Sequence, residues 1–237
     1  MLTFYPVWHI AQLVNIILYS TNYEGRDKLR GHKGRAVLVS NHTTLLDPVL
    51  VSGVMMPERT WHTLLEKTVE TPFLGTFTRL LGGLPLPPGG GGIEKIIMSS
   101  EAIFKYKRFI HFYPEGECYI YNQEIRPFKT GAFFIAARLK LPVFPLLTTF
   151  SARSLKPKTP SVWKSPLERL VVLDPVYPSS YIKYNDAGDI LMSSVKEFAT
   201  AVHDIMQNEI NKRRELNKGE GTQAYFKGQM PRIKGIN

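Results

Sequence analysis

The sequence has little cysteine and fewer acidic than basic residues. One of its 237 residues is a cysteine, Cys118, and 20 Asp and Glu stand against 30 Lys and Arg. A single cysteine excludes an intramolecular disulfide scaffold and a site built from several cysteines, and it is typical of a reducing compartment. The formal net charge of +10 favours an anionic partner. Composition leaves open whether that partner is nucleic acid, a membrane surface or a phosphorylated substrate.

Charged residues are also missing from the start of the chain. Residues 1–23 contain no Asp, Glu, Lys or Arg. A membrane-spanning helix needs about 20 mostly apolar residues, and here His9, Gln12 and Asn15 recur every three residues as a polar stripe. A secretory signal would need a basic start and a small-residue cleavage site, and neither is clear. The pattern predicts a helix that lies at a membrane surface or inserts partly into it.

Basic residues gather directly after this segment, with five Lys and Arg and two acidic residues in 24–35. An apolar helix beside a basic cluster is a two-part signal for anionic lipid, so we expect membrane association, at the cytoplasmic face. The alternative is a helix packed on the core and followed by a solvated loop. We divide the chain into a membrane-associated helical segment with its basic loop at 1–34, a main domain at 35–215 and a basic tail at 216–237. We expect the tail to be frayed and solvated, and the alternative is a second basic contact with the membrane.

The main domain alternates short apolar strands with helices. The Val-rich residues 36–39 predict a buried strand. Further strands are expected at 109–113, 143–148 and 170–173, and helices from Pro48, at 93–107, at 130–140 and from Asp189, as its N-cap, to Arg213. This alternation predicts an α/β fold in which helices flank a mixed, mostly parallel sheet.

A histidine and an aspartate follow the first of these strands. His42 comes just after the strand, where ligand sites form in α/β sheets, and an imidazole accepts a proton near neutral pH. Asp47 can hold one tautomer of His42 if His42 lies in the loop and Asp47 begins the helix. The alternatives are an ordinary helix N-cap for Asp47, which precedes Pro48, and a hydrogen-bonded core histidine for His42.

Two further segments place charged residues next to the end of a predicted strand or the start of a predicted helix. Glu115 and Gly116 follow the strand at 109–113, where the glycine permits close backbone approach and the glutamate is suited to a hydroxyl or an amine. The alternative is a Pro-Gly turn with solvated carboxylates. Arg126 and Lys129 precede a helix start, which suits an anion, and the alternative there is a solvated basic turn.

Four sequence blocks together resemble the ordered signature blocks of the glycerolipid acyltransferases. The closest type is the 1-acyl-sn-glycerol-3-phosphate (lysophosphatidate) acyltransferase. The blocks are His42-x4-Asp47, Tyr-Pro-Glu115-Gly116, Phe-Lys129-x-Gly-Ala and the Leu-Pro-Val-Phe-Pro-Leu run at 141–146. Lys67 and the stretch that follows it resemble the approach to the family's second block. The resemblance covers residues 35–150 and implies an α/β fold with an N-terminal membrane-associated helical motif.

The resemblance also implies an enzyme, a glycerolipid O-acyltransferase that moves a fatty acyl group from an acyl-thioester to a hydroxyl of a lysophospholipid-like acceptor. His42 is then the general base, Asp47 orients it, and backbone N–H groups near Gly116 stabilise the oxyanion. The donor is acyl-coenzyme A or acyl carrier protein, with no cofactor and no metal ion. The substrate-binding candidates are Glu115, Gly116, Glu117, Arg126, Lys129 and Lys67. The expected partners are a membrane lipid surface and a lysolipid, and not nucleic acid.

The sequence departs from the family pattern at two cationic positions. Family members have an arginine near the end of the second block, whereas residues 83–88 here read Gly-Leu-Pro-Leu-Pro-Pro and contain none. The third block of the family continues with Thr or Ser and then Arg, whereas Glu117 and Cys118 follow here. In the family, both cations are associated with the acceptor's phosphate. Since Glu117 would repel a dianionic phosphate, one hypothesis is an uncharged, zwitterionic or amine-bearing acceptor. In the other hypothesis, the phosphate contacts come from Lys129, Arg126 or Lys67.

Other kinds of chemistry are alternatives. A covalent acyl-enzyme would use Ser40, Thr43 or Thr44, but the chain has no Gly-x-Ser-x-Gly elbow. A metal site would take its ligands from His42, Asp47, His111 and Glu115. Their spacing matches no common metal motif, and Cys118 is expected to be a small buried residue.

Two alternatives involve no catalysis. One is a lipid-binding protein at a membrane surface that has lost its activity, against which the presence of His42, Asp47 and Glu115 argues. The other is nucleic-acid binding, which is disfavoured because the basic residues gather at 26–35 and in the tail without interleaved aromatic residues.

Overall fold

A computed structural model describes residues 4–56, 60–65, 83–86, 93–152, 165–217 and 219–229 of the protein. Within these ranges, seven strands form one sheet in the order β1-β7-β6-β2-β5-β3-β4. The strands are β1 (Asn22–Glu24), β2 (Ala36–Ser40), β3 (Trp61–Leu65), β4 (Gly83–Leu86), β5 (Phe109–Phe112), β6 (Val143–Ser151) and β7 (Leu167–Val172). Neighbours run parallel except β6 and β7, which are antiparallel. The predicted α/β fold with a mixed, mostly parallel sheet is therefore confirmed.

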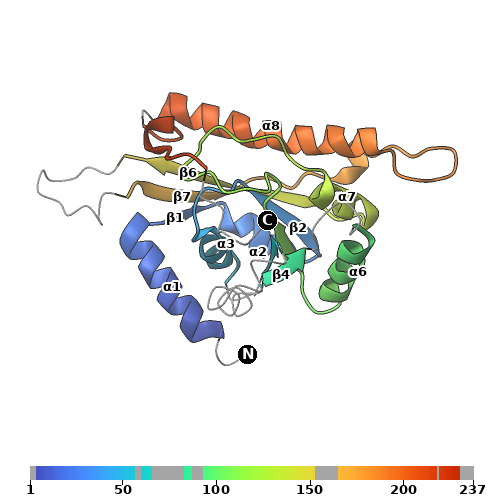
Figure 1. The fold of residues 1–237 in the computed structure, drawn as a ribbon, viewed down its shortest axis with the longest axis horizontal. Helices are drawn as coiled ribbons and strands as arrows, with labels where there is room; N and C mark the ends of the chain where they lie inside the picture. The colour runs from blue at the N-terminus through green and yellow to red at the C-terminus, as the bar shows by residue number, and fades with distance from the viewer. Residues whose placement is uncertain are drawn as a thin grey trace, which may run out of the picture.

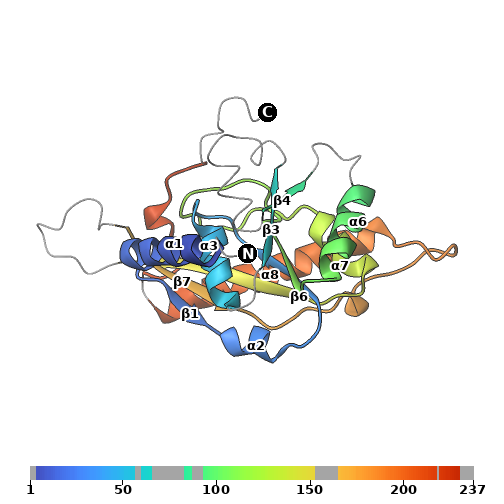
Figure 2. The same cartoon turned by 90° about the horizontal axis from the view of Figure 1, so that it is seen from below.

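Helices cover both faces of this sheet (Figure 1, and turned by 90° in Figure 2). One face is covered by α6 (Ile93–Phe104), α7 (Gly131–Arg138) and α8 (Met192–Leu216), and the other by α2 (Arg26–Gly31) and α3 (Asp47–Met55). The helix α1 (Phe4–Tyr19) packs on α3. Two short 3₁₀ turns, η3 (Pro178–Ser180) and η4 (Gln223–Tyr225), complete the described elements.

The β2 strand shows why its sequence is an unbroken apolar run. Val37 and Val39 belong to the core under α6, α7 and α8, whereas Ala36 and Leu38 belong to the core under α2 and α3. Side chains alternate between the two faces of a strand, and here both faces are covered. All five residues of β2 are buried. The strand is thus held firmly where it ends, just before His42.

Three strands were not predicted from the sequence, and two of them are the edges of the sheet. β1 has three residues, and β4 contains Pro85. Proline lacks the N–H that a central strand must donate, so it is tolerated in an edge strand. Neither segment has the length or the alternation by which strands are recognised.

The start and end of α8 also differ from the prediction. The backbone N–H of Asp189 donates to the side-chain oxygen of Asn185 at 2.7 Å, so Asp189 belongs to the preceding turn. The N-cap position is occupied by Leu191, and the helix continues beyond Arg213 to Leu216. The prediction of Asp189 as the N-cap is therefore wrong, because its turn-forming tendency is satisfied locally.

Part of the basic tail is docked on the domain. The N–H of Gly221 donates to the carbonyl of Phe150, and residues 227–229 pair with residues 119–120. The expectation of a frayed, solvated tail is therefore wrong for residues 219–229, while residues 230–237 lie outside the described part of the chain. The domain boundaries after residues 34 and 215 stay predictions.

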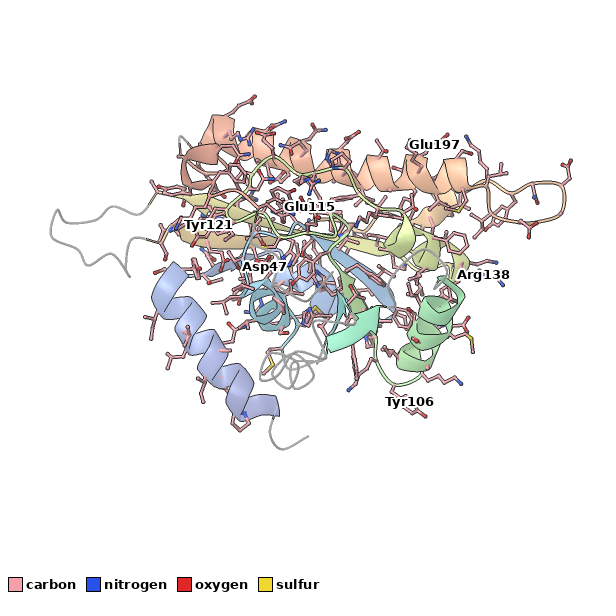
Figure 3. All side chains as sticks on the ribbon, viewed as in Figure 1. Asp47, Tyr106, Glu115, Tyr121, Arg138 and Glu197 are labelled. Atoms are coloured by element: carbon pink, nitrogen blue, oxygen red, sulfur yellow. The ribbon has the colours of Figure 1, made fainter. Side chains whose placement is uncertain are left out.

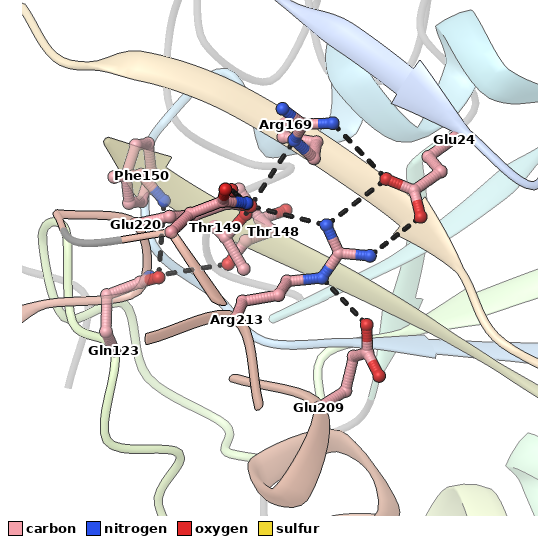
Figure 4. Close-up of polar contacts among 10 residues, drawn as sticks. Glu24, Gln123, Thr148, Thr149, Phe150, Arg169, Glu209, Arg213 and Glu220 are labelled. Carbon is pink, nitrogen blue, oxygen red and sulfur yellow. Dashed lines mark hydrogen bonds and ion pairs between the residues drawn. The ribbon is translucent and has the colours of Figure 1, made fainter. Parts of the chain in front are cut away.

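An ionic network, buried at Arg213 and Glu220 and exposed at Glu24, joins this tail to α8 and to the β1 edge (Figure 4). Arg213 bonds to Glu24 at 2.8 Å, to Glu209 at 2.8 Å and to Glu220 at 3.4 Å. Glu220, which is only 4% exposed, also contacts Arg169 and accepts from the Thr149 hydroxyl. Burial makes such charges costly unless each has its partner, so the network is sensitive to the loss of one member.

Replacing Arg213 by alanine is therefore expected to lower the free energy of unfolding by about 3–5 kcal/mol, since Glu220 then stays buried with less compensation. The matched control is Lys183→Ala, which removes an exposed ion pair with Glu197 and should cost less than about 1 kcal/mol. Urea unfolding of both variants measures the difference. Equal effects of the two substitutions would contradict a structural role for the network.

The α1 helix is turned with a polar residue inward and apolar residues outward. Gln12 is buried, where it donates to the carbonyl of Val49 and accepts from the Tyr23 hydroxyl at 3.2 Å. The exposed apolar residues of α1 are Ile10, Leu13, Val14, Ile16 and Ile17, between 42% and 66% exposed. The predicted helix is thus present, and part of its polar stripe contacts protein instead of water. None of the described helices combines the length and apolarity that crossing a membrane requires.

The basic cluster after α1 is divided by the fold. Arg26 donates to the carbonyl of Gly53, and Lys28 pairs with Asp174 at 2.8 Å. The remaining cations, which are exposed, are Arg30, Lys33 and Arg35. They precede β2 and so lie at the opposite end of that strand from His42.

Candidate active site

His42 and Asp47 meet at the carboxyl end of β2. His42 lies in the loop after the strand and Asp47 is the first residue of α3. His42 Nδ1 lies 2.7 Å from Asp47 Oδ2. The Asp47 side chain is 1% exposed and that of His42 is 22% exposed, so His42 is not a core histidine. Because a carboxylate only accepts, Nδ1 carries the hydrogen, and Nε2 is left to accept a proton.

The Asp47 carboxylate collects donors from the loop that precedes it. Oδ2 accepts the backbone N–H groups of Thr43 at 2.6 Å and Thr44 at 3.0 Å, and Oδ1 accepts both threonine hydroxyls. An N-cap side chain would accept from residues two or three positions later in the helix, so the N-cap alternative for Asp47 is wrong. Five donors, His42 included, surround a carboxylate in its charged form.

Neighbouring segments hold the His42 loop in place. The Asn41 side chain exchanges two hydrogen bonds with the backbone of Thr148, at 2.8 and 2.9 Å. The N–H of Tyr119 donates to the carbonyl of His42, and the N–H of Tyr121 donates to that of Thr43. The loop therefore presents His42 in one geometry, as a positioned base requires.

Glu115 binds backbone on both of its oxygens. Oε1 accepts the N–H of His42 at 2.9 Å, and Oε2 accepts the N–H of Arg126 at 3.1 Å. In Figure 3, Asp47 and Glu115 lie close together near the middle of the molecule. Burial raises the pKa of Glu115 to about 7, although the two N–H donors pull in the opposite direction. Glu115 therefore joins the His42 loop to the segment that leads to α7, while its contact with an acceptor stays a prediction.

The segment around Gly116 brings the predicted cations together. Gly116 has φ +76°, and a Cβ there would lie 2.8 Å from Lys129 Cε, so the lysine stem crosses directly over the glycine. The Gly116 N–H already donates to the carbonyl of Tyr113 at 3.0 Å, which removes this N–H as an oxyanion donor. Glu117 Oε2 lies 2.8 Å from Arg126 Nη1. The repulsion that Glu117 would exert on a phosphate is therefore largely offset by Arg126.

The second-block residues are described only in part. Lys67 lies outside the described residues. Gly83–Leu86, at the place of the family's arginine, form the edge strand β4. The role of Lys67 stays a prediction.

The hydroxyls considered as nucleophiles already have other partners. Those of Thr43 and Thr44 donate to Asp47, and that of Ser40 contacts His111 Nε2 at 2.9 Å. Cys118 is buried, and burial raises the pKa of its thiol, which keeps it protonated. Among the described residues, no group of three His, Cys, Asp or Glu side chains is arranged to hold a metal ion.

A buried histidine pair lies behind the site, and only one of its members, His111, was considered from the sequence, as a candidate metal ligand. Nδ1 of His62 and Nδ1 of His111 are 3.1 Å apart, and their Nε2 atoms contact Ser52 and Ser40 at 2.9 Å. If both rings are neutral, one Nδ1 donates and the other accepts. His62 lies in the unpredicted strand β3, so the pair became apparent only from the strand order.

The stability advantage of wild type over a His111→Gln variant is expected to shrink in acid. Burial lowers the pKa of His111 well below 6.5, so the unfolded chain takes up a proton before the folded protein does. Below pH 6.5 the wild type then loses up to about 1.4 kcal/mol per pH unit, a loss that the glutamine variant lacks. Glu115, with its raised pKa, contributes the opposite slope to both proteins and cancels in the difference.

Urea unfolding at about pH 8 and about pH 5.5 measures this change. His9→Gln, at an exposed position, is the matched control for the exchange of a histidine for glutamine. A stability gap for His111→Gln that stays constant over this range would refute the buried neutral pair.

Comparisons with known proteins place this geometry in context. A family model described as Acyltransferase matches residues 20–149. A 1-acyl-sn-glycerol-3-phosphate acyltransferase of Saccharomyces cerevisiae is 27% identical over 173 residues, which are 72% of this chain and 54% of that protein. One of Haemophilus influenzae is 26% identical over 178 residues, which are 74% of this chain and 68% of that protein. The chain thus spans about half the length of the yeast relative.

A solved structure shares the fold. The crystal structure of the 1-acyl-sn-glycerophosphate (LPA) acyltransferase PlsC from Thermotoga maritima matches with a TM-score of 0.61 and 17% identity. The match covers 89% of this chain and 79% of that one. At this identity the likeness establishes the fold alone.

Proposed function

Since this chain belongs to the acyltransferase family, we propose that it transfers a fatty acyl group from an acyl-thioester to a hydroxyl of a lysophospholipid, with 1-acylglycerol 3-phosphate as the default acceptor. The observation that carries the proposal is the His42–Asp47 pair, in which Nδ1 is bound and Nε2 is left to accept a proton. The names of the yeast and bacterial relatives support the same acceptor.

The reaction needs one base and no covalent enzyme intermediate. His42 Nε2 removes the acceptor's hydroxyl proton, and the oxygen attacks the thioester carbonyl. The new C–O bond forms, the C–S bond breaks, and the proton passes from His42 to the leaving thiolate. Asp47 stabilises the imidazolium that forms in between, since its charge lies 2.7 Å from Nδ1. The donor is a thioester of coenzyme A or of acyl carrier protein, and the reaction uses neither a cofactor nor a metal ion.

The phosphate of the acceptor is bound by the cations of the segment between Glu115 and α7. Lys129 is exposed above Gly116, and Arg126 retains hydrogen-bond donors beyond its contact with Glu117. In this proposal, they take the role that the two arginines have in the family. The competing proposal is an acceptor without a terminal phosphate. It would follow if the contact with Glu117 leaves Arg126 no hydrogen-bond donor for a phosphate.

The experiment is free-thiol release from palmitoyl-coenzyme A by detergent-solubilised protein, with lysolipids that have or lack a terminal phosphate. Activity that is greatest with lysophosphatidate and lost in His42→Ala supports the default acceptor. Activity that depends on His42 only with the other lysolipids supports the alternative acceptor. If neither palmitoyl-coenzyme A nor palmitoyl-acyl carrier protein releases thiol with any acceptor, the enzymatic proposal fails. The remaining hypothesis is then an inactive lipid-binding protein.

We also propose that α1 binds a membrane surface, at the cytoplasmic face, with its exposed apolar side. Ala11 of α1 and Val49 of α3 form a small apolar cluster against which Leu46 packs, and the adjacent Leu45, between His42 and Asp47, is 65% exposed. α1 therefore packs close to the loop that carries the candidate site, and Leu45 adds an exposed apolar side chain there. Arg30, Lys33 and Arg35 lie at the opposite end of β2 from His42. They therefore contribute less to this membrane-binding surface than the sequence implied.

Leu13→Glu is expected to weaken flotation with vesicles that contain phosphatidylglycerol by about tenfold or more, because a charge replaces apolar area in contact with lipid. Ile205→Glu, at a partly exposed position on α8, is the matched control and should float like the wild type. Equal flotation of both variants would contradict the role of α1.

A further inference from the structure

We propose that Tyr113 is a positioning residue, whose ring fixes the orientation of the His42 imidazole. This inference rests on the proposed acyl transfer. The Tyr113 ring stacks on the His42 imidazole, with 4.0 Å between centroids and 22° between planes. Behind it, the His111 ring meets Tyr113 at 89°, with centroids 4.5 Å apart. Tyr113 is thus held between a rigid strand residue and the base.

The stack supplies a restraint that Asp47 alone does not give. A single hydrogen bond from Nδ1 lets the imidazole swing about the axis of that bond. The Tyr113 face blocks this swing on one side, so Nε2 keeps one direction. A small displacement of a base from its productive geometry is enough to slow a reaction strongly.

The stack also has an electrostatic consequence during the reaction. When His42 takes the acceptor's proton, it becomes a cation that lies parallel to the electron-rich face of Tyr113. Such a cation–π contact is stronger when it is shielded from water. Tyr113 therefore favours the charged state of His42 that exists only after proton transfer has begun, which is where an interaction raises kcat.

The ring of Tyr113, not its hydroxyl, performs this role. The hydroxyl oxygen is buried and has no hydrogen-bond partner among the described residues. Burial raises the pKa of this phenol well above its ordinary value, so it stays neutral and donates no charge to the site. Phenylalanine can therefore replace Tyr113 without loss, whereas an aliphatic side chain cannot.

The test compares Tyr113→Phe with two aliphatic variants, Tyr113→Leu and Tyr113→Met, in the thiol-release assay. Tyr113→Phe should keep kcat within about twofold, and the aliphatic variants should lose about 10- to 100-fold in kcat with little change in KM. The ring-current shift of the His42 protons in NMR spectra should persist in Tyr113→Phe and disappear in Tyr113→Leu. A loss in Tyr113→Phe as large as that in Tyr113→Leu would overturn the proposal, as would full kcat in a folded aliphatic variant.

A double-mutant cycle separates positioning of His42 from a general effect of packing. In a His42→Ala background, Tyr113→Leu should cause no further loss of the residual rate, because the base through which it acts is gone. A further loss of the same size in that background would mean that Tyr113 acts on something else. The ring-current shift is measured without turnover, so it reports on the stack even if the wild type proves to lack acyl transfer.

Discussion

Replacing His42 by alanine is expected to lower kcat for acyl transfer by about 10²–10⁴-fold, the usual contribution of a positioned base. The Nε2 atom that is proposed to accept the hydroxyl proton is removed, and no other described side chain in the loop offers a free basic nitrogen in its place. KM should change little, because the candidate contacts to the acceptor come from Lys129 and Arg126 and not from the imidazole. The measurement is initial thiol release at saturating palmitoyl-coenzyme A.

The fold should survive this substitution. Asp47 keeps four donors from Thr43 and Thr44 after the imidazole is lost. The expected loss of unfolding free energy is only about 1–2 kcal/mol, for one hydrogen bond and one ring contact. His32→Ala, before β2 at the opposite end of that strand, is the matched control and should retain activity. Turnover by His42→Ala at the wild-type rate would exclude the general-base mechanism.

The geometry of the candidate catalytic pair was predictable from sequence because it is local. His42 and Asp47 are five residues apart, at a strand end and a helix start, and each of those elements has a strong apolar pattern. The burial of β2 on both of its faces likewise follows from its unbroken run of apolar residues. Two uncertainties had to be settled, namely whether Asp47 caps its helix or faces backward to the loop, and whether His42 is a core histidine.

Features that join distant segments were not predictable in the same way. Gln12 is inward because the carbonyl of Val49, 37 residues away, accepts its hydrogen bond. Glu115 bonds to backbone on two loops, which depends on where the chain passes at Arg126. The pairing of His62 with His111 requires that β3 lie beside β5, and β3 itself lacked a clear signal. In each case the partner is set by strand order and not by neighbouring residues.

The docking of residues 219–229 illustrates the same limit. Their composition is polar, which is typical of a solvated terminus. Glu220 is nevertheless buried, because Arg213 and Arg169 lie where it folds back onto the sheet. The polar character that indicated solvent is used in an internal network, and this is visible only once β7 and α8 are in place.

Replacing Asp47 by asparagine is expected to lower kcat by about 10²–10³-fold while leaving the fold intact. The asparagine oxygen can occupy the Oδ2 position, where it still accepts from His42 Nδ1 and from the backbone N–H groups of Thr43 and Thr44. Its NH₂ group then takes the Oδ1 position and faces two threonine hydroxyls, which can rotate to accept. The tautomer of His42 is thus preserved, and only the negative charge is lost.

This separation of charge from geometry makes Asp47→Asn more informative than Asp47→Ala. Alanine would leave the two backbone N–H groups and the His42 Nδ1–H without their acceptor, so it should lower the free energy of unfolding by several times the ~1 kcal/mol of one hydrogen bond. The Asp47→Asn variant should unfold at nearly the same urea concentration as the wild type and yet have a low kcat. A slow, stable Asp47→Asn enzyme would mean that the carboxylate charge stabilises the imidazolium during proton transfer. A stable Asp47→Asn enzyme with wild-type kcat would instead reduce Asp47 to an anchor for the His42 loop, and the charge would have no part in the chemistry.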